Sequence, residues 1–196
     1  MIQLQASVTS IAATMKAMGL SWCVVGGLAV SARAEPRFTQ DVDLAVIVQN
    51  DQDAAFVIHT LRSHGYVPFM ILEHETQDRL ATVRLQRENG RWREIVDLIF
   101  ASTGIEREIC TAARELELMP GLRVPVAQAG HLLAMKLLSR DQNRPQDDMD
   151  LRSLLEVADA DDLALARGAV LLIEARGYAR GKNLVEGLKT LVTSQS

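Results

Sequence analysis

The stretch CVVGGLAVSARAEPRFTQDVDLAVIV, residues 23–48, decides the fold. It predicts a short apolar strand, a break at Gly26 and Gly27, a short helix, a polar loop and a second strand. The second strand begins with Asp41 and Asp43, which project from the same face because side chains alternate along a strand. Two adjacent carboxylates repel each other unless a cation neutralises them. We therefore expect a metal ion to bind at the start of this strand.

The diglycine and the loop that follows it predict phosphate binding. Gly26 and Gly27 have no Cβ, so the backbone can approach a phosphate beside the N–H groups of a helix start. Arg37 and Thr39 directly precede the acidic pair, and a guanidinium there could bind phosphate oxygens through two hydrogen bonds. The alternative is that Arg37 pairs with a nearby acid, Asp41 or Glu35, and Thr39 only caps the loop.

The order Val25-Gly26-Gly27, thirteen residues, then Asp41-Val42-Asp43-Leu44 resembles the signature of the DNA polymerase β-like nucleotidyltransferase superfamily. The resemblance implies an α+β fold, with a small mixed β-sheet packed with helices and a mainly helical C-terminal part. It also implies an enzyme that transfers a nucleoside monophosphate (NMP) from a nucleoside triphosphate (NTP) to a hydroxyl group. Such a site uses Mg²⁺, commonly as two ions about 3.5–4 Å apart.

Length and composition are those of an ordinary globular protein. The chain has 196 residues, of which 48% are hydrophobic and 23% charged. This predicts one domain, or a small domain with a helical extension. No apolar run is long enough to cross a bilayer and no secretory signal is evident, so we expect a cytoplasmic protein without a membrane partner. With a net charge of −4, binding to a nucleic acid would require a local basic patch.

Hydrophobic periodicity and turn residues divide the chain further. Helices are predicted at 7–18, 28–34, 51–64 (with Asp51 as N-cap), 104–116, 127–139, 148–157, 161–175 and 182–192. Strands are predicted at 22–25, 41–48, 66–72 and 122–126, and Pro68 places the third of these at a sheet edge. A β-hairpin is predicted within 79–100, around the turn dipeptide Asn89-Gly90. We expect residues 1–101 to form the nucleotidyltransferase core and residues 102–196 to complete the nucleotide site.

Asp97 lies inside the apolar run Ile95-Val96-Asp97-Leu98-Ile99, where an unpaired carboxylate would be expensive to bury. It could be neutralised by a neighbouring arginine or by a helix N-terminus. Considered with Asp41 and Asp43, it is a candidate third metal-binding carboxylate, or the general base that deprotonates the acceptor hydroxyl.

The C-terminal part contains two further candidate sites. Lys136 lies among leucines in HLLAMKLLSR, where it could extend its amine to solvent or reach the triphosphate. The segment RPQDDMD, residues 144–150, could simply begin a helix with favourable acids. Together these features resemble the AbiEii-like nucleotidyltransferases, in which a helical Lys and an Arg-x-Lys-Asp-x-x-Asp segment help to form the nucleotide site. Lys136, Arg144, Asp147 and Asp150 match that pattern, and Gln146 stands where the family commonly has Lys.

Three cations, Arg176, Arg180 and Lys182, surround Gly177 and Gly181. We interpret them as a solvated helix–helix turn; the alternative is that they contribute to RNA or nucleotide binding.

The resemblance implies RNA, notably tRNA, or a protein as acceptor, and a role as the toxin of a toxin–antitoxin system with a cognate antitoxin as partner. Two alternatives stay open. One is an antibiotic-type nucleotidyltransferase that modifies an aminoglycoside or a lincosamide. The other is a non-catalytic regulatory or antitoxin module with the same fold.

Overall fold

A computed structural model of the chain describes residues 2–74, 79–88 and 95–194. Its described part contains one seven-stranded mixed sheet with the strand order β3-β4-β5-β2-β1-β7-β6. Neighbouring strands are antiparallel except for two parallel pairs, β2 with β5 and β1 with β7. The strands are β1 (Trp22–Val25), β2 (Asp41–Val46), β3 (Tyr66–His74), β4 (Arg79–Arg87), β5 (Ile95–Ile99), β6 (Arg114–Met119) and β7 (Leu122–Val126).

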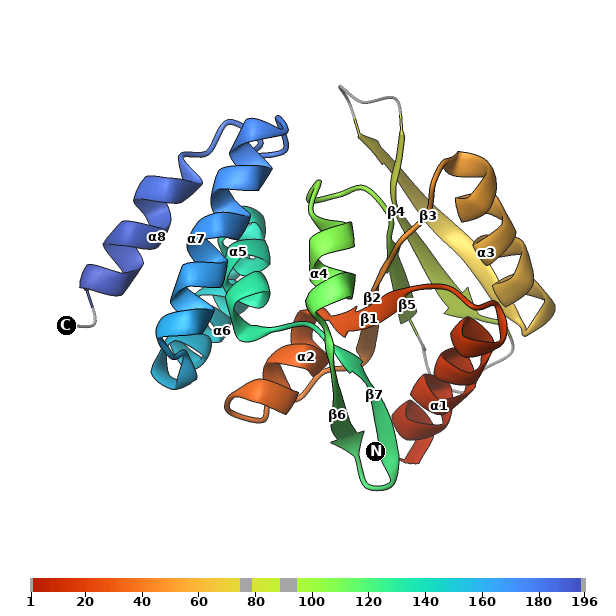
Figure 1. The fold of residues 1–196 in the computed structure, drawn as a ribbon. Helices are drawn as coiled ribbons and strands as arrows, with labels where there is room; N and C mark the ends of the chain where they lie inside the picture. The colour runs from red at the N-terminus through yellow and green to blue at the C-terminus, as the bar shows by residue number, and fades with distance from the viewer. Residues whose placement is uncertain (1, 75–78, 89–94, 195–196) are drawn as a thin grey trace.

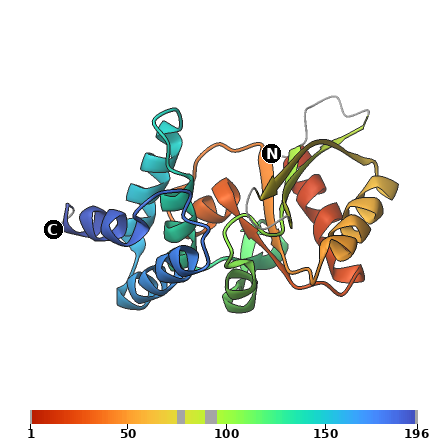
Figure 2. The ribbon, with the colours of Figure 1, turned by 90° about the horizontal axis from the view of Figure 1, so that it is seen from above.

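Helices lie at both ends of this sheet. The four C-terminal helices gather at one end of the molecule, and α1 and α3 pack at the opposite end, as the two views agree (Figures 1 and 2). None of the described helices is long and apolar enough to cross a membrane. The helices are α1 (Ile2–Ala17), α2 (Gly26–Arg33), α3 (Asp51–Ser63), α4 (Glu106–Ala112), α5 (Ala129–Ser139), α6 (Pro145–Val157), α7 (Ala160–Ala175) and α8 (Leu184–Thr193).

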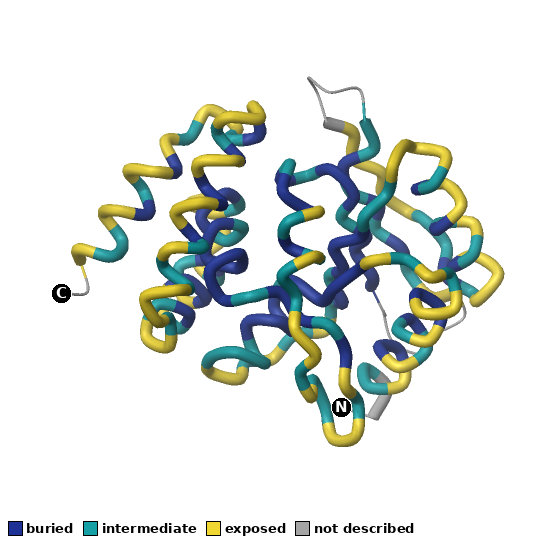
Figure 3. Tube along the Cα trace, viewed as in Figure 1, coloured by how far each residue is buried: buried dark blue, intermediate teal, exposed yellow. Residues whose placement is uncertain are grey.

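The hydrophobic core is continuous from the central strands into α5 (Figure 3). All four residues of β1 are buried, because this strand has a neighbour on each side and helices around it. Helix α5 packs closely on α7 at Gly130, where a Cβ would lie 2.3 Å from the backbone carbonyl oxygen of Asp162. This close packing fixes the helix that carries Lys136.

The predicted α+β fold is confirmed, and most predicted elements lie where the sequence placed them. Strand β3, which contains Pro68, is an edge of the sheet, and β4 and β5 form the predicted antiparallel pair. The turn Asn89-Gly90 lies outside the described residues. The predicted division at residue 101 stays a prediction, although β6 and β7 extend the same sheet from beyond that point.

Two local predictions were wrong. The helix expected over 104–116 ends at Ala112, and residues 114–119 form β6 instead. This segment alternates charged and apolar residues and pairs with β7, so sheet formation outweighs the helix propensity of Arg, Glu and Leu. The N-cap of α3 is Asn50 rather than Asp51, because the Asn50 side chain accepts a hydrogen bond from the backbone N–H of Asp53.

Candidate functional site

A cavity of about 530 Å³ lies between the sheet and helices α5 and α6. Ten of the eleven residues predicted as site residues line it, although they come from five separate segments of the chain. The ten are Gly26, Gly27, Arg37, Thr39, Asp41, Asp43, Asp97, Lys136, Arg144 and Asp147. The eleventh, Asp150, forms ion pairs with two of these lining residues, Arg37 and Lys136. The structure therefore assembles the predicted set at one place, while the role of each residue stays a prediction.

The acidic pair and Asp97 meet because β2 and β5 are parallel neighbours. In their register Asp43 stands opposite Asp97, and Asp41 stands opposite Ile95. Asp41 and Asp43 share the cavity face, while the intervening Val42 is buried on the other face. Three carboxylates from two strands thus face the same cavity, as the sequence predicted.

The space beside the diglycine is occupied by protein side chains. A Cβ on Gly26 would lie 1.9 Å from Oδ2 of Asp43, and a Cβ on Gly27 would lie 2.6 Å from Nη2 of Arg37. Gly26 also has a φ of +60°, which disfavours any side chain. The two glycines therefore let the acid and the guanidinium approach the start of α2. The prediction that they admit a phosphate stays a prediction.

Electrostatic repulsion is concentrated at Asp43. Burial, the charge of Asp97 and the charge of Asp41 raise the pKa of Asp43 to about 6, whereas Lys136 and the backbone N–H of Gly27 oppose that rise. A pKa raised in this way means that negative charge at this position is disfavoured until a cation binds nearby. Asp41 and Asp43 have the oxygen donors and the excess charge that fit a divalent ion such as Mg²⁺.

The sequence analysis did not identify Arg84, which is the main additional residue of the site. It stands opposite Asp97 in the β4–β5 register and donates Nε to Oδ1 at 2.7 Å and Nη2 to Oδ2 at 2.5 Å. The neutralising arginine, which the sequence analysis gave as the alternative to metal binding by Asp97, is therefore present and engages both oxygens of Asp97. Within the described residues no three acidic, His or Cys side chains are arranged to hold a metal ion. As the side chains stand, Arg84 occupies both oxygens of Asp97, so this carboxylate is not available to a metal ion.

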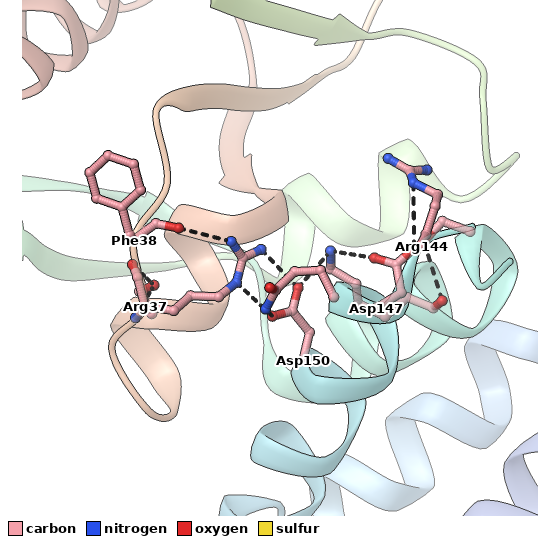
Figure 4. A network of polar contacts seen from close by, with 9 residues as sticks. Arg37, Phe38, Arg144, Asp147 and Asp150 are labelled. Carbon is pink, nitrogen blue, oxygen red and sulfur yellow. Dashed lines mark hydrogen bonds and ion pairs between the residues drawn. The ribbon is translucent and has the colours of Figure 1, made fainter. Parts of the chain in front are cut away.

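The opposite side of the cavity holds a closed set of ion pairs (Figure 4). Arg37, from the loop after α2, binds both carboxylate oxygens of Asp150 at 2.6 and 2.9 Å. Lys136 binds Asp147 at 2.9 Å and Asp150 at 2.8 Å. The acid that Arg37 binds is therefore Asp150, which the sequence analysis had not named as its partner. These contacts join the loop before β2 to helices α5 and α6.

Burial makes this network stiff. The side chain of Asp150 is only 1% exposed, and that of Lys136 is 13% exposed, so Lys136 points into the protein rather than to solvent. Although burial opposes the change, hydrogen bonds from Arg37 and Lys136 lower the pKa of Asp150. Gln146 also donates to Asp150, at 3.2 Å, so it contributes to the network where the family commonly has Lys.

We call the two sides of the cavity the strand wall, formed by Asp41, Asp43, Arg84 and Asp97, and the helix wall, formed by Arg37, Lys136, Asp147 and Asp150. Arg144 lies at the rim beside the helix wall, 3.8 Å from Asp147 and largely exposed. Several lining residues had no distinct sequence signal: the apolar Met70, Leu72 and Ile99 beside the strand wall, and Ser102 and Thr103 beyond it. Arg180, interpreted from the sequence as part of a solvated turn with RNA or nucleotide binding as the alternative, also lines the cavity.

The chain shares its fold with solved structures of nucleotidyltransferases, at low sequence identity. The chain is 16% identical to ANT(2″)-Ia in complex with adenylyl-2″-tobramycin, with a TM-score of 0.55 over 100% of this chain and 99% of that chain. It is 13% identical to the lincosamide adenylyltransferase LnuA with lincomycin bound, with a TM-score of 0.51 over 81% and 98% of the two chains. A nucleotidyltransferase-like antigen from Paracoccidioides brasiliensis is 17% identical, with a TM-score of 0.54 over 95% and 92%.

The chain belongs to the AbiEii family, described as nucleotidyl transferase AbiEii toxin, type IV toxin–antitoxin system; the family profile matches residues 16–193. No curated protein matches the sequence at a significant level. The family match confirms the resemblance drawn from Gly26-Gly27, Asp41-x-Asp43, Lys136 and residues 144–150.

Proposed function

We propose that this nucleotidyltransferase transfers an NMP group from a magnesium-bound NTP to a hydroxyl acceptor in the cytoplasm. The observation that supports this most directly is the convergence of Asp41, Asp43 and Lys136 on one cavity beside the start of α2. The three side chains supply the oxygen ligands and the cation that a metal-bound triphosphate requires.

Each wall has a distinct role in this proposal. Asp41 and Asp43 hold the metal ion, which would neutralise the triphosphate and assist departure of pyrophosphate. Lys136 and Arg37 donate hydrogen bonds to phosphate oxygens, and the buried Asp150 holds both donors in place. Thr39 and the N–H groups at the start of α2 line the same end of the cavity.

We assign Asp97 as the general base that removes the proton from the acceptor hydroxyl. Arg84 engages both of its oxygens and thereby fixes the position of the carboxylate, which lines the cavity where the acceptor would bind. Whether Asp97 also contacts a second metal ion depends on Arg84 releasing one of those oxygens. We therefore assign it first as a base and only then as a metal ligand.

RNA, notably tRNA, is the acceptor we favour, with a protein side chain as second choice. The cavity is lined by five basic side chains (Arg37, Arg84, Lys136, Arg144 and Arg180) and four acidic ones (Asp41, Asp43, Asp97 and Asp147). This balance suits an anionic acceptor better than a polycationic aminoglycoside. With the family assignment, it supports a toxin that modifies host RNA and is held in check by a cognate antitoxin.

A small-molecule acceptor is the second candidate. Met70, Leu72 and Ile99 form an apolar wall beside Asp97, where an uncharged antibiotic ring could pack. The solved structures of LnuA and ANT(2″)-Ia, which hold lincomycin and adenylyl-tobramycin, make the class plausible. A regulatory module without catalysis ranks third, because all three carboxylates are present.

The test is incubation of the purified protein with each labelled NTP, Mg²⁺ and a cell extract, followed by separation of RNA, protein and small molecules. Label entering RNA and lost with Asp43→Ala is the expected result. Label in a small molecule would select the antibiotic-type alternative. No transfer from any NTP, with purified lincomycin and tobramycin included as acceptors, would leave the regulatory module.

A further inference from the structure

The turn between α7 and α8 carries three cations, and two of them hold it in place. Arg176 donates to the backbone carbonyl of Gly104 and pairs with Glu108 at 2.7 Å. Lys182 donates to the backbone carbonyls of Leu138 and Arg140 at 2.6 Å each, near the end of α5. Arg180 differs from both, because its side chain lines the cavity.

The backbone of Arg180 is held in an unusual conformation. Its φ is +53°, and among the described residues it is the sole non-glycine residue with a positive φ. The left-handed region costs an ordinary residue about 1 kcal/mol, so the surroundings must enforce it. A glycine at this position would avoid that cost. The sequence nevertheless keeps a long cationic side chain there, with Gly177 and Gly181 on either side.

The guanidinium of Arg180 is oriented by a loop that belongs to the site. Its Nη2 donates to the backbone carbonyl of Ser102 at 3.0 Å and to the Ser102 hydroxyl at 2.8 Å. Ser102 follows β5, the strand that carries Asp97, and also lines the cavity. Nε and Nη1 of Arg180 make no hydrogen bond within the described part of the chain, so they are free to bind a ligand.

The charge of Arg180 is not balanced by an acid. The other cavity cations each have an acidic partner: Arg84 faces Asp97, Arg37 faces Asp150, Lys136 faces Asp147 and Asp150, and Arg144 lies 3.8 Å from Asp147. Among the described residues no carboxylate forms an ion pair with Arg180, and the charges that act on it from farther away are the basic Arg144 and, more weakly, the acidic Glu106. Burial and the charge of Arg144 lower the pKa of Arg180, although a guanidinium remains charged at any physiological pH.

We propose that Arg180, with Arg144 beside it, forms a phosphate-binding subsite at the rim of the cavity. The inference rests on the proposed function and names the recognition chemistry at this end of the site. A phosphate would give Arg180 the anion that the described part of the protein does not place against it, and the exposed Arg144, 3.8 Å from Asp147, could donate to the same phosphate. The phosphate comes either from the triphosphate or from the phosphodiester backbone of an RNA acceptor.

Equilibrium binding tests this without relying on turnover. Wild type, Arg180→Gln, Arg180→Lys and Arg167→Gln are titrated with inorganic tripolyphosphate, with ATP and Mg²⁺, and with a single-stranded RNA oligonucleotide. Arg167 is the matched control, since it is an exposed arginine on α7 outside the cavity. Thermal unfolding checks that each variant is folded at the assay temperature.

We expect Arg180→Gln to weaken at least one probe about tenfold, Arg180→Lys to weaken it less, and Arg167→Gln to bind as wild type does. Weaker tripolyphosphate and ATP binding assigns the subsite to the triphosphate. Weaker RNA binding alone, with a salt slope reduced by about one, assigns it to the acceptor.

Three outcomes would overturn the inference: unchanged binding of all three probes by Arg180→Gln, an equal loss in Arg167→Gln, or no binding of any probe by the wild type. The outcome of the label-transfer experiment is independent of the outcome of this binding experiment. Loss of phosphate binding in Arg180→Gln without any transfer by the wild type would leave the subsite standing and reject the proposed function.

Discussion

The strand wall and the helix wall face the same cavity but balance their charges differently. On the strand wall three carboxylates lie in one cavity, and burial with the charges of Asp97 and Asp41 raises the pKa of Asp43. Arg84 engages both oxygens of Asp97. On the helix wall two cations and two carboxylates form a closed network around the buried Asp150. The strand wall therefore carries concentrated negative charge, whereas the helix wall is organised before any ligand binds. In the proposed function, this difference assigns the metal ion to the strand wall and the phosphate donors to the helix wall.

The largest expected effect is the loss of nucleotidyl transfer when a carboxylate of the strand wall is removed. Asp41→Ala and Asp43→Ala should each reduce transfer at least about 10³-fold, because the proposed metal site then keeps only one of its two carboxylates. Neither variant should be less stable than wild type, since each removes repulsion. Label incorporation and thermal unfolding measure the two effects. Full activity in either variant would remove the strand wall from the mechanism.

Breaking the helix wall should give the largest loss of stability. Asp150→Ala leaves Arg37 and Lys136 without their shared buried partner, and the free energy of unfolding should fall by about 3–5 kcal/mol. Asp148→Ala is the matched control, because the Arg140–Asp148 pair is exposed and should contribute at most about 1 kcal/mol. Urea unfolding of both variants gives the comparison. Equal losses would mean that the network is not the preformed element described above.

Arg84→Met sharpens the contrast by making the strand wall wholly acidic. Without the guanidinium, the charge of Asp97 repels those of Asp41 and Asp43 more strongly, so the ligand-free protein should lose about 1–3 kcal/mol. Mg²⁺ should then stabilise the variant more than it stabilises wild type. Melting temperatures with and without Mg²⁺ measure this difference. An identical Mg²⁺-induced shift in both proteins would show that Asp97 does not take part in binding the ion.

The smallest effect is a gain in stability from Asp43→Asn. The pKa of Asp43 in the folded protein, about 6, lies above its ordinary value of 3.8, so this group destabilises the fold increasingly as pH rises through that interval. At pH 7.5 without metal, Asp43→Asn should therefore raise Tm by a few degrees. The gain should shrink as pH falls below about 6, where the wild-type carboxyl takes up a proton. A gain that is constant from pH 4 to 8 would contradict the charge repulsion.

Local sequence was sufficient for the strand–helix–strand unit of residues 22–46, because periodicity, the diglycine and the acidic pair all act within one short stretch. It also indicated Asp97, because a carboxylate in an apolar strand needs a partner. The partner itself depends on register: Arg84 meets Asp97 only because β4 and β5 pair with those residues opposite each other.

The missed features share a tertiary origin. Residues 114–118 contain good helix formers and became a strand because β7 was available to pair with them. Arg37 found Asp150, 113 positions away, rather than the acids next to it in sequence. Arg180, whose side chain lines the cavity, has a left-handed backbone conformation that the neighbouring residue types did not predict.

The parallel pairing of β1 with β7 matters for anyone who divides this protein into fragments. A piece ending at residue 101 would retain Trp22–Val25 but lose β7, the strand that covers its outer side. Its four apolar residues would then border an open backbone edge, a template on which other copies can add strands. Such truncations should therefore aggregate through this edge, whereas the full chain covers it with β7.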